Sequence, residues 1–178
     1  MYTQKLHAGD PFPSIKVTRE DGQLVEAATA AAPADWRMLL VYRGRHCPMC
    51  TRYLNLLAEY VDELAETGVD ILAVSADSEA QLLSHRADLP DNISYAYGLT
   101  EEQMHTLGLY MSAPRSAQET DHNFAEPGLF IINQHGQLHV VDISNNPFVR
   151  PDIATLVRGL KWIRDPDNHY PIRGTASR

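Results

Sequence analysis

The sequence predicts an α/β protein built on a mixed sheet, and three observations support this prediction. Residues 36–42 form a short apolar run typical of a buried strand, and residues 48–68 follow it with helical spacing. Residues 69–75 form a second apolar run. A strand, a helix and a strand in succession form a right-handed parallel unit, and hairpin signals flank this unit in the chain. The sheet should therefore contain parallel and antiparallel pairs.

The first hairpin lies near the N-terminus. Residues 14–17 and 23–26 flank the pair Asp21-Gly22, a common turn sequence between antiparallel strands. An alanine-rich loop then leads into the first buried strand.

Residues 48–68 are interpreted as one amphipathic helix. Pro48 lies in its first turn, where proline is tolerated, and Gly68 ends it. Apolar side chains recur at three- and four-residue steps, at Tyr53, Leu54, Leu57, Tyr60, Val61, Leu64 and Ala65.

Shorter elements follow the second buried strand. Residues 77–88 predict a helix, residues 93–97 a strand, and Thr100 the start of another short helix. Residues 112–126 are polar and aperiodic. Because so long a loop is often functional, we expect it to act as a lid or to contact the substrate.

The C-terminal part predicts a second hairpin and a last helix. Residues 127–133 and 137–143 flank a turn that contains Gly136. Residues 151–163 then place apolar side chains on one helical face.

Length and composition predict a single domain over residues 1–178, with residues 166–178 as a C-terminal tail. The net charge of −8 and the lack of Lys/Arg runs argue against nucleic acid or a membrane surface as a partner. The N-terminus has no signal-peptide pattern, and no apolar run approaches the ~18 residues that span a bilayer. We therefore expect a cytoplasmic protein.

The two cysteines, Cys47 and Cys50, form a C-P-x-C motif at the junction between the first buried strand and the long helix. A reducing compartment keeps ordinary disulfides open, so the motif favours a redox-active pair over a structural bridge. A helix N-terminus stabilises an anion, so we expect the Cys47 thiol to ionise readily.

Positive charge should add to this effect. Arg43 and Arg45 both lie close to Cys47 in the chain and share strand parity, so they should lie on one side. We expect Arg45 to approach the thiolate, while Arg43 is either a second such group or a surface ion-pair partner. His46 is interpreted as a packing or solvent-facing residue, with proton transfer as the alternative.

A zinc site is the other common use of a C-x-x-C pair. The chain has no second such pair, so histidines such as His135 and His139 would have to complete it. Both lie in the C-terminal hairpin, away from the motif. We therefore predict neither a metal nor another cofactor.

Three segments within residues 6–165 carry a family resemblance: the Gly-Asp-Pro-Phe-Pro lead at 9–13, Tyr-Arg-Gly-Arg-His-Cys-Pro at 42–48, and Gly-Leu-Phe-Ile-Ile-Asn at 128–133. They resemble the peroxiredoxin-like redoxins of the alkyl hydroperoxide reductase and thiol-specific antioxidant superfamily. The resemblance implies a thioredoxin-like fold, with a central mixed sheet and helices on both faces. It also implies an antioxidant thiol oxidoreductase.

Roles for the motif follow from this resemblance. Cys47 would attack a peroxide oxygen or a disulfide, and Cys50 would resolve the product, leaving a Cys47–Cys50 disulfide. Pro48 would tune the balance between dithiol and disulfide. An external thioredoxin- or glutaredoxin-like dithiol would then reduce the bridge, and a homodimer is a candidate assembly.

The sequence departs from the peroxidase pattern near the motif. Peroxiredoxins look like Pro-x-x-x-Thr/Ser-x-x-Cys, where Leu40 and Gly44 stand here. They also carry an arginine before the Gly-Leu-Phe-Ile-Ile strand, where Pro127 stands here. Thioredoxins have a cis-proline at this point, so we expect a cis Glu126–Pro127 bond packed against the cysteines.

Three functions stay open on these residues. The first is thiol-dependent reduction of peroxides or disulfides, with Arg115 or Arg150 replacing the missing arginine. The second is thioredoxin-type disulfide reduction without peroxidase activity, which Pro127 favours. The third is a non-enzymatic redox sensor whose loop at residues 112–126 changes partner affinity when the disulfide forms.

Overall fold

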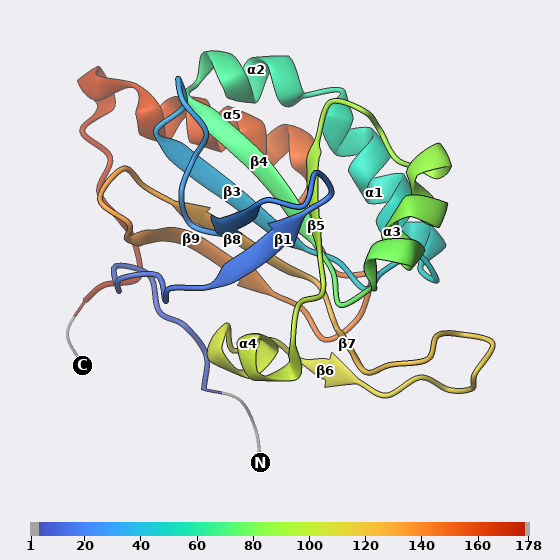
Figure 1. The fold of residues 1–178 in the computed structure, drawn as a ribbon. Helices are drawn as coiled ribbons and strands as arrows, with labels where there is room; N and C mark the ends of the chain where they lie inside the picture. The colour runs from blue at the N-terminus through green and yellow to red at the C-terminus, as the bar shows by residue number, and fades with distance from the viewer. Residues whose placement is uncertain (1–3, 177–178) are drawn as a thin grey trace.

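The computed structural model describes residues 4–176, and its centre is a seven-stranded sheet in the order β2-β1-β5-β4-β3-β8-β9 (Figure 1). Strands β3, β4 and β5 run parallel to one another, while the outer neighbours pair antiparallel. The predicted mixed sheet is therefore confirmed. The strands are β1 (Lys16–Arg19), β2 (Leu24–Glu26), β3 (Trp36–Val41), β4 (Val69–Val74), β5 (Ser94–Tyr97), β8 (Gly128–Ile132) and β9 (Leu138–Ile143).

Helices cover both faces of the sheet, as predicted, but unequally. Alternation along β3 sends Met38 and Leu40 into one core and Leu39 and Val41 into the other. The first core also holds side chains of α1 (Pro48–Ala58), α2 (Val61–Glu66), α3 (Glu79–His85) and α5 (Ile153–Arg164). The second holds α4 (Glu101–Thr106) and the N-terminal segment.

Both predicted hairpins are present. Strands β1 and β2 meet at a turn in which Gly22 has a φ of +81°, a conformation that favours glycine. Strands β8 and β9 pair from Gly128 opposite Ile143, so the second hairpin is also as expected.

The single helix predicted over residues 48–68 is wrong in one respect. The chain breaks after α1, where the N–H groups of Glu59 and Tyr60 donate to the carbonyls of Leu56 and Leu57, 3.2 and 3.0 Å away. These three-residue steps tighten the chain before α2 begins. The turn lets Leu64 of α2 enter the same core as α1.

Two other predicted elements differ in detail. The helix expected over residues 77–88 is α3 followed by a 3-10 turn, η1 (Arg86–Asp88). The long loop at residues 112–126 has a base of paired strands, β6 (Met111–Ser112) and β7 (Phe124–Ala125). Figure 1 shows the rest of this loop reaching outward beyond the sheet.

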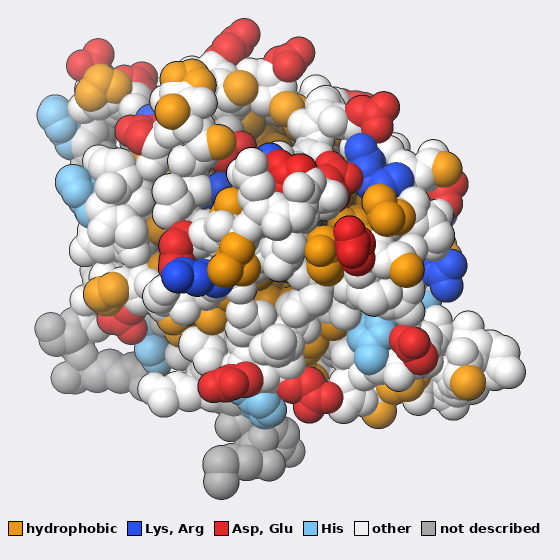
Figure 2. Space-filling model, in the orientation of Figure 1, with side chains coloured by type: hydrophobic (Ala, Val, Ile, Leu, Met, Phe, Trp, Pro, Cys, Tyr) orange, Lys and Arg blue, Asp and Glu red, His pale blue; other side chains and the backbone are white. Residues whose placement is uncertain are grey.

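The surface carries mixed charges. Figure 2 shows acidic, basic and apolar side chains interspersed over the face that it presents. Within residues 4–176, no helix has the length and apolar character needed to cross a membrane. After α5 the chain forms a short 3-10 turn, η2 (Pro166–Asn168), and returns toward the N-terminal segment, where Thr175 lies beside Gly9.

Candidate active site

Cys47 is the N-cap residue of α1, as the sequence predicts. Its Sγ accepts a hydrogen bond of 3.2 Å from the backbone N–H of Cys50, and Pro48 lies in the first turn. The sulfur therefore occupies the place where a helix N-terminus holds an oxygen or an anion. That place suits the thiolate expected at Cys47 in the reduced protein.

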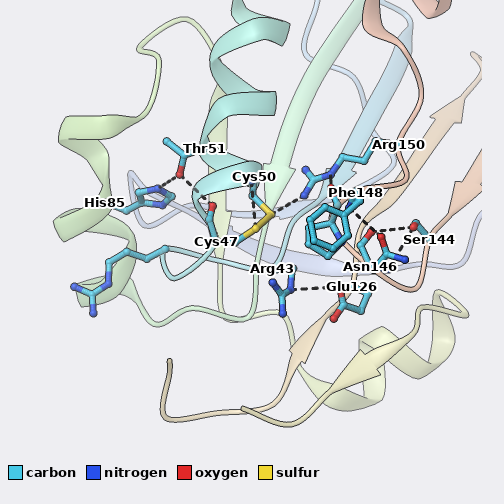
Figure 3. The surroundings of a disulfide bond; sticks show 12 residues. Arg43, Cys47, Cys50, Thr51, His85, Glu126, Ser144, Asn146, Phe148 and Arg150 are labelled. Carbon is cyan, nitrogen blue, oxygen red and sulfur yellow. Dashed lines mark hydrogen bonds and ion pairs between the residues drawn. A yellow bond between two sulfur atoms is a disulfide. The ribbon is translucent and has the colours of Figure 1, made fainter. Parts of the chain in front are cut away.

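The two cysteines are joined in a disulfide across this first helical turn, with Cα atoms 5.3 Å apart (Figure 3). Cys47 is 1% exposed and Cys50 is fully buried. The bond is therefore present with α1 intact from Pro48 onward. A reactant must reach a sulfur that is almost covered.

Arg150 is the cation that reaches the sulfur atoms. Its Nη2 donates to Cys50 Sγ over 2.8 Å, from the loop between β9 and α5 (Figure 3). Its Nε donates to the carbonyl of Pro147, and its guanidinium lies 5.0 Å from the ring centre of Tyr53 on α1. Of the two arginines proposed as substitutes for the missing one, Arg150 lies at the site.

Arg43 supports the long loop and does not point to the solvent. Its guanidinium lies 3.3 Å from Glu126 and 3.8 Å from Glu119, and it stacks 4.7 Å from the ring of Phe124. Glu126 is buried and also accepts a hydrogen bond of 2.7 Å from Ser112. Arg43 therefore ties both sides of the loop to the end of β3.

Arg45 is directed to α3, not to the sulfur atoms. Its Nη1 donates to Ser84 over 3.0 Å, and its backbone N–H donates to the buried carboxylate of Asp77 over 2.7 Å. The expectation that Arg45 approaches the thiolate is not met, because the turn at Gly44 ends the strand alternation on which it depended. Gly44 has a φ of +131°, a left-handed conformation that favours glycine.

His46 packs against the ring of Phe124, with ring centres 4.5 Å apart. Burial is the largest of the effects that lower its pKa, followed by the charge of Arg43. Neither ring nitrogen has a hydrogen-bond partner among the described residues. Both effects favour the neutral imidazole, and its position agrees with the packing interpretation.

The predicted cis Glu126–Pro127 bond is wrong. The bond is trans, and within residues 4–176 the cis peptide lies at Ala32–Pro33. The chain at Pro127 is extended because the N–H of Glu126 donates to Tyr110 and the carbonyl of Pro127 accepts from Ser144, at 2.8 and 3.0 Å. These bonds on both sides make Pro127 the lead into β8.

A buried histidine near the motif escaped the sequence analysis. His85 of α3 is buried, and its Nε2 lies 2.8 Å from Thr51 Oγ1 on α1. Thr51 also donates to the carbonyl of Cys47 over 3.4 Å. The signal for His85 in the sequence was weak, because a single histidine at the end of a helix belongs to no motif of spaced residues.

Metal ligands do not gather at this site or elsewhere in residues 4–176, where no group of three or more His, Cys, Asp or Glu side chains is placed to hold an ion. His139 of the C-terminal hairpin packs 4.6 Å from the ring of Trp36. His135 lies in the β8–β9 turn.

An open, polar cleft of about 780 Å³ lies next to the motif, between the long loop and α3. Arg45 and His46, which precede Cys47 in the chain, line this cleft together with Arg115 of the long loop. Arg115 is 87% exposed at its side chain and pairs with Glu119, so it does not reach the sulfur atoms.

The sequence matches the profile of the AhpC/TSA family over residues 8–141, which include β3, the cysteine motif and most of the C-terminal hairpin. The chain belongs to the AhpC/TSA family. Membership confirms the predicted peroxiredoxin-like group and makes the protein a thiol-based oxidoreductase. The comparison with curated proteins found no match.

Solved structures share the fold of this AhpC/TSA protein at low identity. A peroxiredoxin-like protein from Aquifex aeolicus has a TM-score of 0.69 at 19% identity, over 89% of this chain and 88% of that one. A mutant of peroxiredoxin 6 from Arenicola marina reaches 0.74 at 16% identity, over 89% and 74%. Mycobacterium tuberculosis AhpC gives 0.69 at 19% identity, over 90% and 99%. The predicted thioredoxin-like fold is thereby confirmed.

Proposed function

We propose that this protein reduces hydroperoxides by cycling Cys47 and Cys50 between dithiol and disulfide. The observation that carries the proposal is the pair itself, bonded across the first turn of α1 with Cys47 as the N-cap. Membership of the AhpC/TSA family supports the same chemistry.

In this scheme the Cys47 thiolate attacks the outer oxygen of the hydroperoxide. The O–O bond breaks, an alcohol or water leaves after taking up a proton, and Cys47 becomes a sulfenic acid. Cys50 then attacks Cys47 Sγ and expels the hydroxyl group as water, which forms the disulfide. An external dithiol restores both thiols.

The burial of the sulfur atoms favours a small oxidant. Cys47 is 1% exposed, so a disulfide on a protein surface must displace neighbouring groups to align with its sulfur. A hydroperoxide is much smaller, and the polar cleft that Arg45 and His46 line lies beside the residues that precede Cys47.

Disulfide reduction is the second candidate, and one observation favours it. Gly44 occupies the place of the peroxidase hydroxyl, and the carboxylate of Asp77 fills the space that a side chain would need. Without that hydroxyl, one group that holds a peroxide in the peroxidase pattern is lost.

Stopped-flow mixing of reduced protein with hydrogen peroxide, cumene hydroperoxide and a small disulfide tests these alternatives. Acid quenching and alkylation would follow formation of the Cys47–Cys50 bond. We expect one disulfide per peroxide consumed and a peroxide rate that exceeds the disulfide rate by orders of magnitude. The reverse order would assign disulfide reduction, and slow reaction with every oxidant would indicate a redox sensor.

A further inference from the structure

The cationic side chain at this site, Arg150, contacts the resolving cysteine, Cys50. Arg150 Nη2 lies 2.8 Å from Cys50 Sγ, whereas Cys47 Sγ accepts a backbone N–H at 3.2 Å. A full positive charge stabilises a thiolate more strongly than a single peptide N–H does. The two sulfur atoms are therefore held by donors of different strength.

Arg150 is fixed in this position from several sides. Its Nε is bound to the carbonyl of Pro147, and its guanidinium lies over the ring of Tyr53. The hydroxyl of Tyr53 donates to the carbonyl of Pro151 over 2.7 Å, which anchors the same loop to α1. A guanidinium held in this way loses little conformational freedom when it pairs with a sulfur atom.

The charge of Arg150 is not neutralised by a carboxylate. Among residues 4–176 it makes no ion pair within 4.0 Å, and its Nη1 is buried without a hydrogen-bond partner. Burial is the main effect that lowers the pKa of Arg150, because it disfavours the charged form. After burial, Tyr53 raises the pKa of Arg150, Arg43 lowers it and Glu126 raises it. Arg43 and Glu126 pair with each other. A thiolate at Cys50 is thus the anion that this buried cation lacks.

We infer that Arg150 makes Cys50 the leaving thiolate when the disulfide is reduced, so that the external dithiol attacks Cys47. The inference rests on the proposed function for the role of the disulfide as a working state. Arg150, from the loop before α5, would thus contact a reacting atom directly.

Atoms and electrons balance in this step. A thiolate of the external dithiol attacks Cys47 Sγ, the new S–S bond forms there, and the Cys47–Cys50 bond breaks with its electron pair on Cys50. The second thiolate of the dithiol then attacks its partner sulfur in the mixed disulfide. The dithiol is oxidised by two electrons, and Cys47 leaves as a thiolate that takes up a proton.

Trapping with a monothiol tests the direction of attack. Oxidised protein is mixed with 2-mercaptoethanol and iodoacetamide, quenched with acid and mapped by mass spectrometry. We expect mercaptoethanol on Cys47 and the alkyl group on Cys50, with at least a tenfold excess over the reverse pattern. The reverse pattern, or an even mixture, would overturn the inference.

The equilibrium with dithiothreitol tests the role of the charge. Arg150→Met should favour the disulfide about tenfold more than the wild type does, which corresponds to about 30 mV in potential. Arg150→Lys should retain part of the effect, because it keeps the charge. Arg158→Met on the exposed face of α5 is the matched control and should not shift the equilibrium. An Arg150→Met equilibrium equal to that of the wild type would refute the role.

Two further measurements keep the test decisive. If Arg150→Met does not fold, Tyr53→Phe removes only the bond to Pro151 and should shift the equilibrium in the same direction by a smaller factor. The rate with hydrogen peroxide is measured on the same proteins. A shifted equilibrium without a peroxide reaction would remove the proposed oxidant and keep this inference, whereas a peroxide reaction with an unshifted equilibrium would do the opposite.

Discussion

Gly44 and Asp77 fit together so closely that a β-carbon on residue 44 would lie 2.5 Å from the Oδ1 atom of the carboxylate. Gly44 follows β3 and Asp77 follows β4, and these strands are parallel neighbours. Their carboxyl ends therefore bring the two residues together beside the cysteine motif. The buried carboxylate also accepts the N–H of Arg45, which shapes the turn that leads to Cys47.

Gly44→Ala should destabilise the fold by about 2–4 kcal/mol, from backbone strain and overpacking together. The φ of +131° is unfavourable for alanine, and the new β-carbon would collide with Asp77. Urea unfolding measures the change in the free energy of unfolding.

Gly136→Ala separates the two causes. Gly136 has a φ of +73°, but a β-carbon there would meet nothing within 4 Å. This variant should lose only about 1–2 kcal/mol, from the conformation alone. Equal losses in the two variants would show that the contact with Asp77 contributes nothing.

The cysteine variants should fail at different steps. Cys47→Ser removes the nucleophile and should lower peroxide turnover about a thousandfold or more. Cys50→Ser should still consume one equivalent of peroxide and stop at the sulfenic acid, which dimedone labels and mass spectrometry detects. Similar residual turnover in both variants would contradict these separate roles.

Much of the fold could be predicted because its signals are local. The apolar runs at β3 and β4 and the turn at Gly22 each depend on neighbouring residues. The break between α1 and α2 could not be predicted, since the apolar spacing continues through Tyr60 and only packing against the sheet decides the turn. The extended chain at Pro127 is likewise held by bonds to Tyr110 and Ser144, which are not its neighbours in the sequence.

The candidate site was predicted less completely. Cys47 and Cys50 were evident from spacing, and their place at the start of α1 followed from the strand and Pro48. Arg150 is separated from Cys50 by 100 positions in the chain, so no local pattern could select it over Arg45. Asp77 was missed, although the expected parallel pairing of β3 and β4 brings the carboxyl ends of both strands to the same edge of the sheet.

Arg43→Met should loosen the long loop. The side chain ties Glu126 and Glu119 to the end of β3, and its loss leaves the buried Glu126 carboxylate without its cation. A local loss of about 1–2 kcal/mol would raise the open population roughly 5- to 30-fold. Trypsin cleavage after Arg115, in the exposed part of the loop, measures this opening.

Lys161→Met is the control for that experiment. Lys161 pairs with Glu63 at the surface, away from the loop, so its loss should leave cleavage after Arg115 unchanged. An unchanged cleavage rate in Arg43→Met itself would mean that the remaining contacts, such as Gln81 with Asp121, suffice to hold the loop.

His85 should make stability fall in mild acid. Burial is the main cause that lowers the pKa of this histidine from its ordinary 6.5 in the folded protein. Above pH 6.5 both states hold it neutral, so it contributes no penalty. As the pH falls below 6.5, His85 takes up a proton in the unfolded chain but stays neutral in the folded protein. The free energy of unfolding then decreases by at most about 1.4 kcal/mol per pH unit, until the folded pKa is reached.

His85→Gln removes this proton uptake while it keeps a polar side chain opposite Thr51. Urea unfolding at pH 8.0, 6.5 and 5.5 measures the free energy of unfolding of variant and wild type. At pH 8.0 the difference between them reports the altered contact alone. Between pH 6.5 and 5.5 the variant should lose less stability than the wild type does. Because burial also lowers the pKa values of His46 and His139, a smaller slope from these two should remain. Parallel profiles for variant and wild type would mean that His85 takes up its proton equally in both states.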